Sequence, residues 1–121
     1  MLDIKKLLTK ILGMFSTTEF TCTINSSMSG GESRGTYSKA TGLVSINFYC
    51  NSNTDVTTTT ALFTIPSAYR PSEDKGGTGI LKNSAGTVAA TGLRARASSG
   101  AIVQLGSGTA RSVQGVIQYK L

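Results

Sequence analysis

Side chains able to perform acid–base or nucleophilic chemistry are scarce in this sequence. It contains no histidine, which excludes a hydrolytic site of the Ser-His or Cys-His kind in its usual form. A glycosidase needs two carboxylates that face one sugar, but only Glu73 and Asp74 are close in sequence, and neighbouring strand residues point to opposite faces. The six acidic residues are Asp3, Glu19, Glu32, Asp55, Glu73 and Asp74. We therefore expect no enzymatic activity, with a small glycosidase as the third candidate function.

Sites for a metal or a phosphate are also missing from the sequence pattern. Two cysteines without histidine do not complete a four-ligand zinc site. The glycine pairs Gly30-Gly31 and Gly76-Gly77 lack the Lys-Thr context of a phosphate-binding loop, and we interpret them as flexible turns. We expect no metal and no cofactor.

The two cysteines have a spacing that predicts burial. Cys22 and Cys50 each follow a phenylalanine by two residues, so in a strand each thiol shares the face of Phe20 or Phe48. The sequence has no segment with the pattern of a secretory signal, which favours two reduced core thiols over a disulfide. The disulfide remains the alternative.

The charge of the chain makes an acidic partner a hypothesis to consider. Twelve Lys and Arg against six Asp and Glu give a net charge of +6. The basic residues are scattered, however, and no aromatic residues interleave with them as a stacking platform for bases would require. We expect a solvated basic surface and no nucleic-acid partner.

The first segment, LDIKKLLTKILGMF, has the spacing of an amphipathic helix. Its apolar residues recur every three or four positions, with Lys5, Lys6 and Lys10 between them. It is too short and too charged to span a bilayer, so we expect no membrane insertion. Three roles remain open, namely packing on its own domain, lying on a membrane surface, or self-association. For self-association, the two-heptad seam is Ile4, Leu8, Ile11 and Phe15.

Beyond this helix the period of the apolar residues changes to two. We expect residues 1–15 to serve oligomerisation or anchoring to other proteins, residues 16–18 to be a linker and residues 19–121 to be one β domain. Thr, Ser and Val are abundant, and turn sequences such as NSAGT and SSG separate short runs. The predicted strands lie at 20–24, 35–39, 44–50, 60–65, 79–82, 87–97, 101–105 and 113–121. This pattern predicts an all-β fold, an antiparallel, jelly-roll-like β-sandwich.

Both prolines of the chain fall in the stretch LFTIPSAYRP. Pro66 should end a strand because it has no N–H for the ladder, and Pro71 should hold Arg70 in an extended conformation. We expect Tyr69 to pack as a plug and Arg70 to cap carbonyl groups or pair with an acid. A binding role for these two residues is the less favoured alternative.

A resemblance to a known family rests on the order of several segments. TGLVSINFY, a threonine-rich gap, LFTIPSAYRP, NSAGTV, SSGAIVQL and a closing VQGVIQYKL resemble the head domains of tailed-phage tail-fibre and baseplate receptor-binding proteins. The resemblance covers roughly residues 37–121, and I-P-x-x-Y-R-P is its most distinctive part. It implies a β-sandwich homotrimer that binds saccharides or other polymers of the bacterial surface. It also implies a virion location after synthesis in the host cytoplasm.

The loops predicted to bind a ligand are those that combine an aromatic ring with amide and guanidinium groups. The candidates are Arg34, Tyr37, Tyr49, Asn51 and Asn53, and their clustering favours a polar, neutral saccharide over a phosphate polymer. The competing interpretation is that they are ordinary exposed strand-end residues. If a ligand binds elsewhere, we expect its site near Arg94 and Arg96. The leading hypothesis is a host-attachment virion protein, and the runner-up is a structural virion component such as a head fibre or connector.

Overall fold

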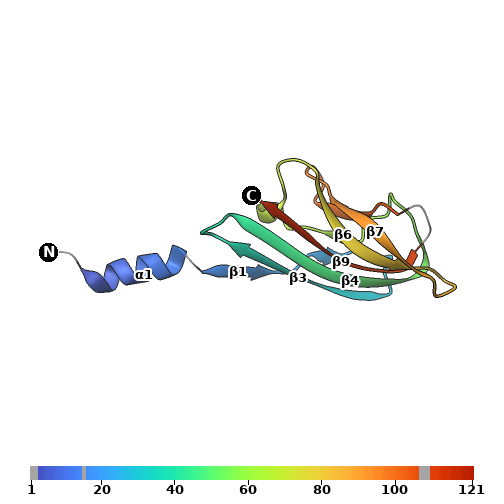
Figure 1. The fold of residues 1–121 in the computed structure, drawn as a ribbon, viewed down its shortest axis with the longest axis horizontal. Coiled ribbons are helices and arrows are strands. Elements are labelled where there is room, and N and C mark those ends of the chain that lie inside the picture. The colour runs from blue at the N-terminus through green and yellow to red at the C-terminus, as the bar shows by residue number, and fades with distance from the viewer. Residues whose placement is uncertain (1–2, 15, 107–109) are drawn as a thin grey trace.

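The structure consists of one helix followed by a β domain. This computed structural model describes residues 3–14, 16–106 and 110–121. Helix α1 (Ile4–Met14) extends away from the β domain along the long axis of the molecule (Figure 1). The strands are β1 (Thr17–Phe20), β2 (Thr23–Ile24), β3 (Gly30–Ser38), β4 (Leu43–Val56), β5 (Phe63–Thr64), β6 (Lys75–Lys82), β7 (Val88–Ala95), β8 (Ala101–Gln104) and β9 (Ala110–Lys120). A short 3₁₀ helix, η1 (Ser67–Tyr69), lies between β5 and β6.

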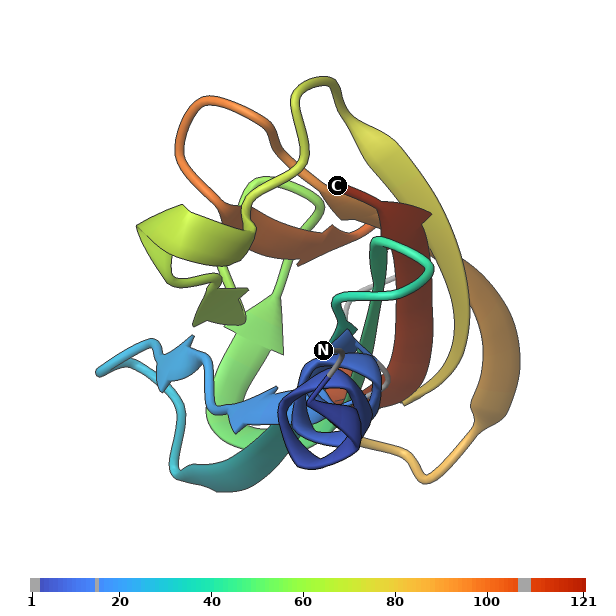
Figure 2. The same cartoon turned by 90° about the vertical axis from the view of Figure 1, so that its left-hand side faces the viewer.

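The nine strands form a single antiparallel sheet in the order β1-β3-β4-β9-β6-β7-β8-β5-β2. Strands β1 and β2 stand at opposite ends of this order, yet only Thr21 and Cys22 separate them in the chain. The sheet must therefore curl until its two ends meet, and the view along the helix shows the strands arranged around a central core (Figure 2). The prediction of an all-β antiparallel fold with an N-terminal helix is confirmed.

Several predicted boundaries were wrong. The strand expected at 20–24 is two strands, because the chain leaves β3 after Phe20 and pairs with β5 from Thr23 onward. Thr17 and Thr18, assigned to the linker, already belong to β1 and pair with β3.

The two glycine pairs are also in strands and not in flexible turns. Gly30-Gly31 begins β3, and Gly76-Gly77 lies in β6. At Gly77 an added Cβ would overlap the side chain of Ile117 in the neighbouring strand β9. The glycine therefore serves the close approach of two strands.

The core is built by the alternating residues of β4 and their partners across the sheet. Val44, Ile46, Phe48 and Cys50 are all buried, and the ring of Phe48 packs against Phe63 at 5.4 Å. The buried residues of β9 and β7 that complete this layer are Val113, Ile117, Tyr119, Leu93 and Ala95. Because one face of each strand is buried, the residues between these must point to solvent.

The proline segment has the structural role that the sequence predicted. Tyr69 packs on the core, with its ring stacked on Phe20 at 4.2 Å and tilted against Tyr37 at 5.8 Å. Arg70 is extended, and its Nε donates to the carbonyl of Ile65 at 2.8 Å. Tyr69 and Arg70 thus tie the crossing segment between β5 and β6 to the domain.

Both cysteines are buried free thiols, as expected. Cys50 is paired across the ladder with Gly31 of β3 and Val113 of β9. The backbone N–H of Cys22 donates to Ser33 Oγ at 2.8 Å. Burial raises the pKa of each thiol to about 11.

The Arg70 contact generates a stability prediction at Gly100. Gly100 has φ +70°, and an added Cβ would meet Arg70 and lie 2.8 Å from the carbonyl oxygen of Ile65. Gly42 has φ +71° but its Cβ would find only Leu121 O at 3.6 Å. We expect Gly42→Ala to cost about 1 kcal/mol of unfolding free energy from its left-handed backbone, and Gly100→Ala at least ~2 kcal/mol. If urea denaturation gave the same loss of unfolding free energy for both variants, the crowding of Arg70 and Ile65 at Gly100 would add nothing to the cost of the left-handed backbone.

A second prediction concerns the thiols. With a pKa of about 11, each cysteine in the folded protein should react with iodoacetamide at pH 8 at least about tenfold more slowly than in urea. Cys22→Ala and Cys50→Ala should each cost about 1 kcal/mol through lost packing, and a reducing agent should leave the melting temperature unchanged. Detection of a Cys22–Cys50 disulfide by mass spectrometry of freshly purified protein would contradict this account.

Candidate functional site

The outward side of four adjacent strands gathers an exposed aromatic ring, polar groups and charges. Cross-strand pairing places Glu32, Tyr49, Gln114 and Ile80 in one row across β3, β4, β9 and β6. The next row holds Arg34, Asn47, Val116 and Thr78. These eight residues are called the Tyr49 face below.

The Tyr49 face combines apolar surface with hydrogen-bonding groups. Tyr49 is 45% exposed, Ile80 44% and Val116 39%, although all three have large apolar side chains. The amides of Asn47 and Gln114 lie beside them in the same two rows. An exposed apolar patch with a polar surround is typical of a binding surface.

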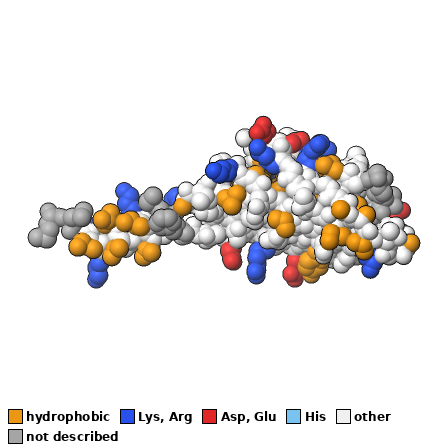
Figure 3. Space-filling view, in the orientation of Figure 1, with side chains coloured by type: hydrophobic (Ala, Val, Ile, Leu, Met, Phe, Trp, Pro, Cys, Tyr) orange, Lys and Arg blue, Asp and Glu red, His pale blue; other side chains and the backbone are white. Residues whose placement is uncertain are grey.

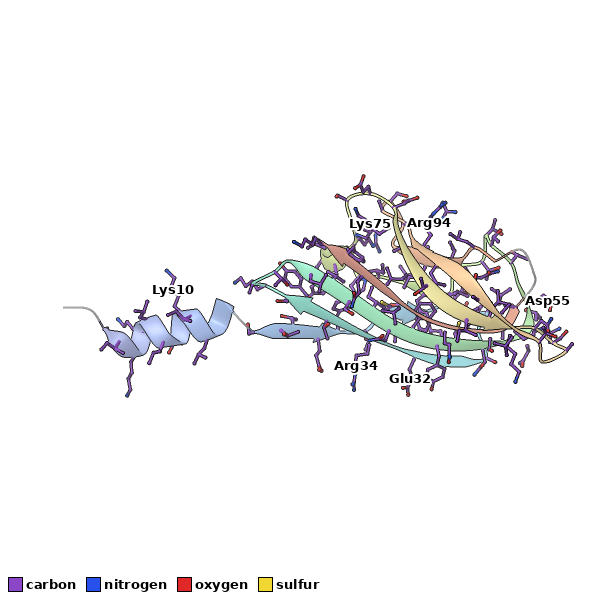
Figure 4. All side chains as sticks on the ribbon, viewed as in Figure 1. Lys10, Glu32, Arg34, Asp55, Lys75 and Arg94 are labelled. Atoms are coloured by element: carbon purple, nitrogen blue, oxygen red, sulfur yellow. The ribbon has the colours of Figure 1, made fainter. Side chains whose placement is uncertain are left out.

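An open depression of about 1380 Å³ lies over this part of the molecule. All eight residues of the Tyr49 face line it, together with Glu19, Phe20, Thr21 and Ile24 and with core residues that include Cys22, Phe48 and Phe63. Figure 4 shows Glu32 and Arg34 projecting away from the core on the same side of the molecule.

The charged residues that line the depression are two acids and one base, Glu19, Glu32 and Arg34. Within residues 3–14, 16–106 and 110–121 none of the three takes part in a salt bridge. Other acids are engaged, since Asp55 pairs with Arg111 at 2.7 Å and Glu73 with Lys75 at 2.9 Å. The hydrogen bond from Lys75 lowers the pKa of Glu73.

Two of the five predicted ligand-binding residues belong to the Tyr49 face, and a third lies beside it. Arg34 and Tyr49 are members, and Asn51 is one row further along the same side of β4. Asn53 is exposed but lies where the register between β4 and β9 shifts, outside the depression. The placing of Tyr37 was wrong, because Tyr37 pairs with the buried Val44 and packs inward against Tyr69.

The sequence interpretation missed the contribution of β6 and β9. Thr78, Ile80, Gln114 and Val116 are between 29 and 67 positions from Tyr49 in the chain. Alternation in VQGVIQY indicates which of its residues point outward, but not that β9 lies beside β4. Only the folded structure shows that β9 lies beside β4.

The alternative site at Arg94 and Arg96 is separate from this face. Arg94 is exposed on β7 opposite Gly76, and Arg96 is half-buried just after that strand. Neither lines the depression. Figure 4 shows Arg94 beside Lys75 on the opposite side of the molecule from Arg34 and Glu32.

Helix α1 forms a second exposed feature. Its apolar residues Ile4, Leu7, Leu8, Ile11 and Leu12 are 40–69% exposed. Figure 3 shows hydrophobic side chains along the helix that the β domain does not cover. These exposures exclude the alternative in which the helix packs on its own domain. Phe15 of the predicted seam lies outside the described residues.

Comparisons with known proteins identified no relative of this chain. Neither a scan against protein-family models nor a search of curated proteins found a match. The described residues contain no group of three or more His, Cys, Asp or Glu placed to hold a metal ion. They also contain no helix long and apolar enough to cross a membrane. The resemblance to phage receptor-binding heads therefore stays a prediction.

Proposed function

We propose that this protein is a non-enzymatic attachment protein that binds a saccharide on the Tyr49 face. The observation that carries the proposal is the exposed ring of Tyr49, which has Glu32 and Gln114 directly opposite it on the two neighbouring strands. Such a row presents an apolar surface flanked by hydrogen-bond donors and acceptors, one strand spacing of about 4.8 Å away on each side.

The chemistry of this face suits a saccharide. An aromatic face packs against the C–H side of a sugar ring, and amide, carboxylate and guanidinium groups satisfy its hydroxyls. Asn47, Gln114, Glu32 and Arg34 offer these groups in the two rows around Tyr49. Since the face is built on strands and not on loops, its groups are held in fixed relative positions.

The positions of the carboxylates support a binding function over the small glycosidase. Glu19 is opposite Thr36 on β3, four residues from Glu32, which corresponds to roughly 13 Å along the strand. Glycosidase carboxylates are separated by about 5–9.5 Å. Glu73 and Asp74 are engaged elsewhere, with Lys75 and with the backbone N–H of Ala97.

The resemblance to phage receptor-binding heads supports a virion location and a bacterial surface saccharide as the partner. Within this proposal the exposed apolar side of α1 joins copies of the chain in a homotrimer or contacts other virion proteins. A purely structural virion component is the second candidate, favoured by the uncovered helix and distinguished by the absence of glycan binding.

Replacement of Tyr49 tests the saccharide site. We expect Tyr49→Ala to weaken binding to the best glycan on an array, and to host cells, about tenfold or more, because the ring surface is lost. Asn51→Ala should have a smaller effect. The control is Arg94→Ala, which should bind normally, and all three variants should keep their stability within about 0.5 kcal/mol because the residues are exposed. Undiminished binding by folded Tyr49→Ala protein would place the site elsewhere.

Light scattering tests the proposed assembly through α1. At tens of micromolar we expect a mass of about 38 kDa, three times the chain mass of 12.6 kDa. Leu8→Glu should convert the protein to monomer by placing a charge in the apolar side of α1. The matched control Lys6→Glu, on the polar side, should leave the mass unchanged. A monomeric wild-type protein would contradict the prediction.

A further inference from the structure

The depression over the Tyr49 face has the opposite sign of charge from the chain as a whole. The chain carries +6, whereas the charged lining residues are Glu19, Glu32 and Arg34, which sum to −1. The charge of Arg34 is flanked on both sides, since Glu32 precedes it by two residues and Glu19 lies opposite Thr36, two residues after it. A negative site on a basic protein disfavours a polyanionic ligand.

Glu32 lies directly beside Tyr49 on the Tyr49 face. The two residues are directly paired across β3 and β4 on the outward side, and paired side chains of an antiparallel ladder have Cβ atoms roughly 4.5–5.5 Å apart. A carboxylate at this distance reaches the region above the ring. Glu32 has no salt-bridge partner in the described part of the chain.

The Tyr49 side chain is 45% exposed, and among the described residues no other aromatic ring packs against it. The ring contacts among the described residues involve Phe20, Tyr37 and Tyr69 in one group and Phe48 with Phe63 in another, all on the inner side of the sheet. An aromatic face beside a free carboxylate is the arrangement that binds an ammonium group, because the ring quadrupole and the carboxylate charge both attract a cation.

We infer that the Tyr49 face recognises a protonated amino group of an amino sugar, so that its ligand is a glycan with free amines and not a neutral or anionic one. In this arrangement Glu32 accepts hydrogen bonds from the ammonium group, and Tyr49 contacts it through the ring face. Gln114, on the other side of Tyr49, is placed for a hydroxyl of the same sugar. This inference rests on the proposed saccharide function and specifies its ligand class.

Two oligosaccharides with one backbone provide the test. Isothermal titration calorimetry would compare the hexamer of β-1,4-linked glucosamine, which carries free amines, with the hexamer of N-acetylglucosamine, which does not. We expect the full-length protein to bind the glucosamine hexamer about tenfold more tightly, the size expected when a cation–π contact and a carboxylate act together. Glu32→Gln should remove this preference, and Glu73→Gln, remote from the depression, should retain it.

The outcomes separate this inference from the function on which it rests. Equal binding of the two hexamers, or tighter binding of the acetylated one, overturns the amine inference. If Tyr49→Ala weakens both in that case, the saccharide site itself stands. Binding of neither hexamer also overturns the inference, and the glycan array with Tyr49→Ala then decides the proposed function separately.

Discussion

The structure depends on a single constraint, the register of β3, β4, β9 and β6 in one antiparallel ladder. Burial of Val44, Ile46, Phe48 and Cys50 fixes which side of β4 faces the core. Because side chains alternate with a period of two, the same burial forces Asn47 and Tyr49 outward. A slip of one residue between these strands would bury Tyr49 and expose the core, so the core and the Tyr49 face are set by the same register.

Two structural features support this arrangement of strands, one within the ladder and one where the sheet closes. Gly79 of β6 and Gly115 of β9 are paired directly, and an added Cβ at Gly115 would overlap the Leu93 methyl and the carbonyl oxygen of Thr78. The strands can thus approach with Leu93 packed over them only while both positions lack a side chain. At the ends of the sheet, the stack of Tyr69 on Phe20 joins the crossing segment to β1 and closes the curled sheet.

Sequence reasoning predicted features that depend on local spacing and missed those that depend on pairing. The helix, the alternation of β4, the buried cysteines and the roles of Tyr69 and Arg70 each follow from residues within a few positions of one another. Tyr37 was misplaced because the start of β3, and therefore which side each of its residues faces, is set by pairing with β4. Gln114 and Ile80 join Tyr49 only because β9 lies between β4 and β6, a neighbourhood that long connections create.

The most direct test of this account is a map of backbone amide chemical shifts during titration with the glycan that binds best on an array. The account predicts that the largest shifts occur in the row of Glu32, Tyr49, Gln114 and Ile80, with smaller shifts in the row of Arg34 and Asn47. Shifts concentrated at Arg94 and Arg96, or along α1, with the Tyr49 row unchanged, would contradict it.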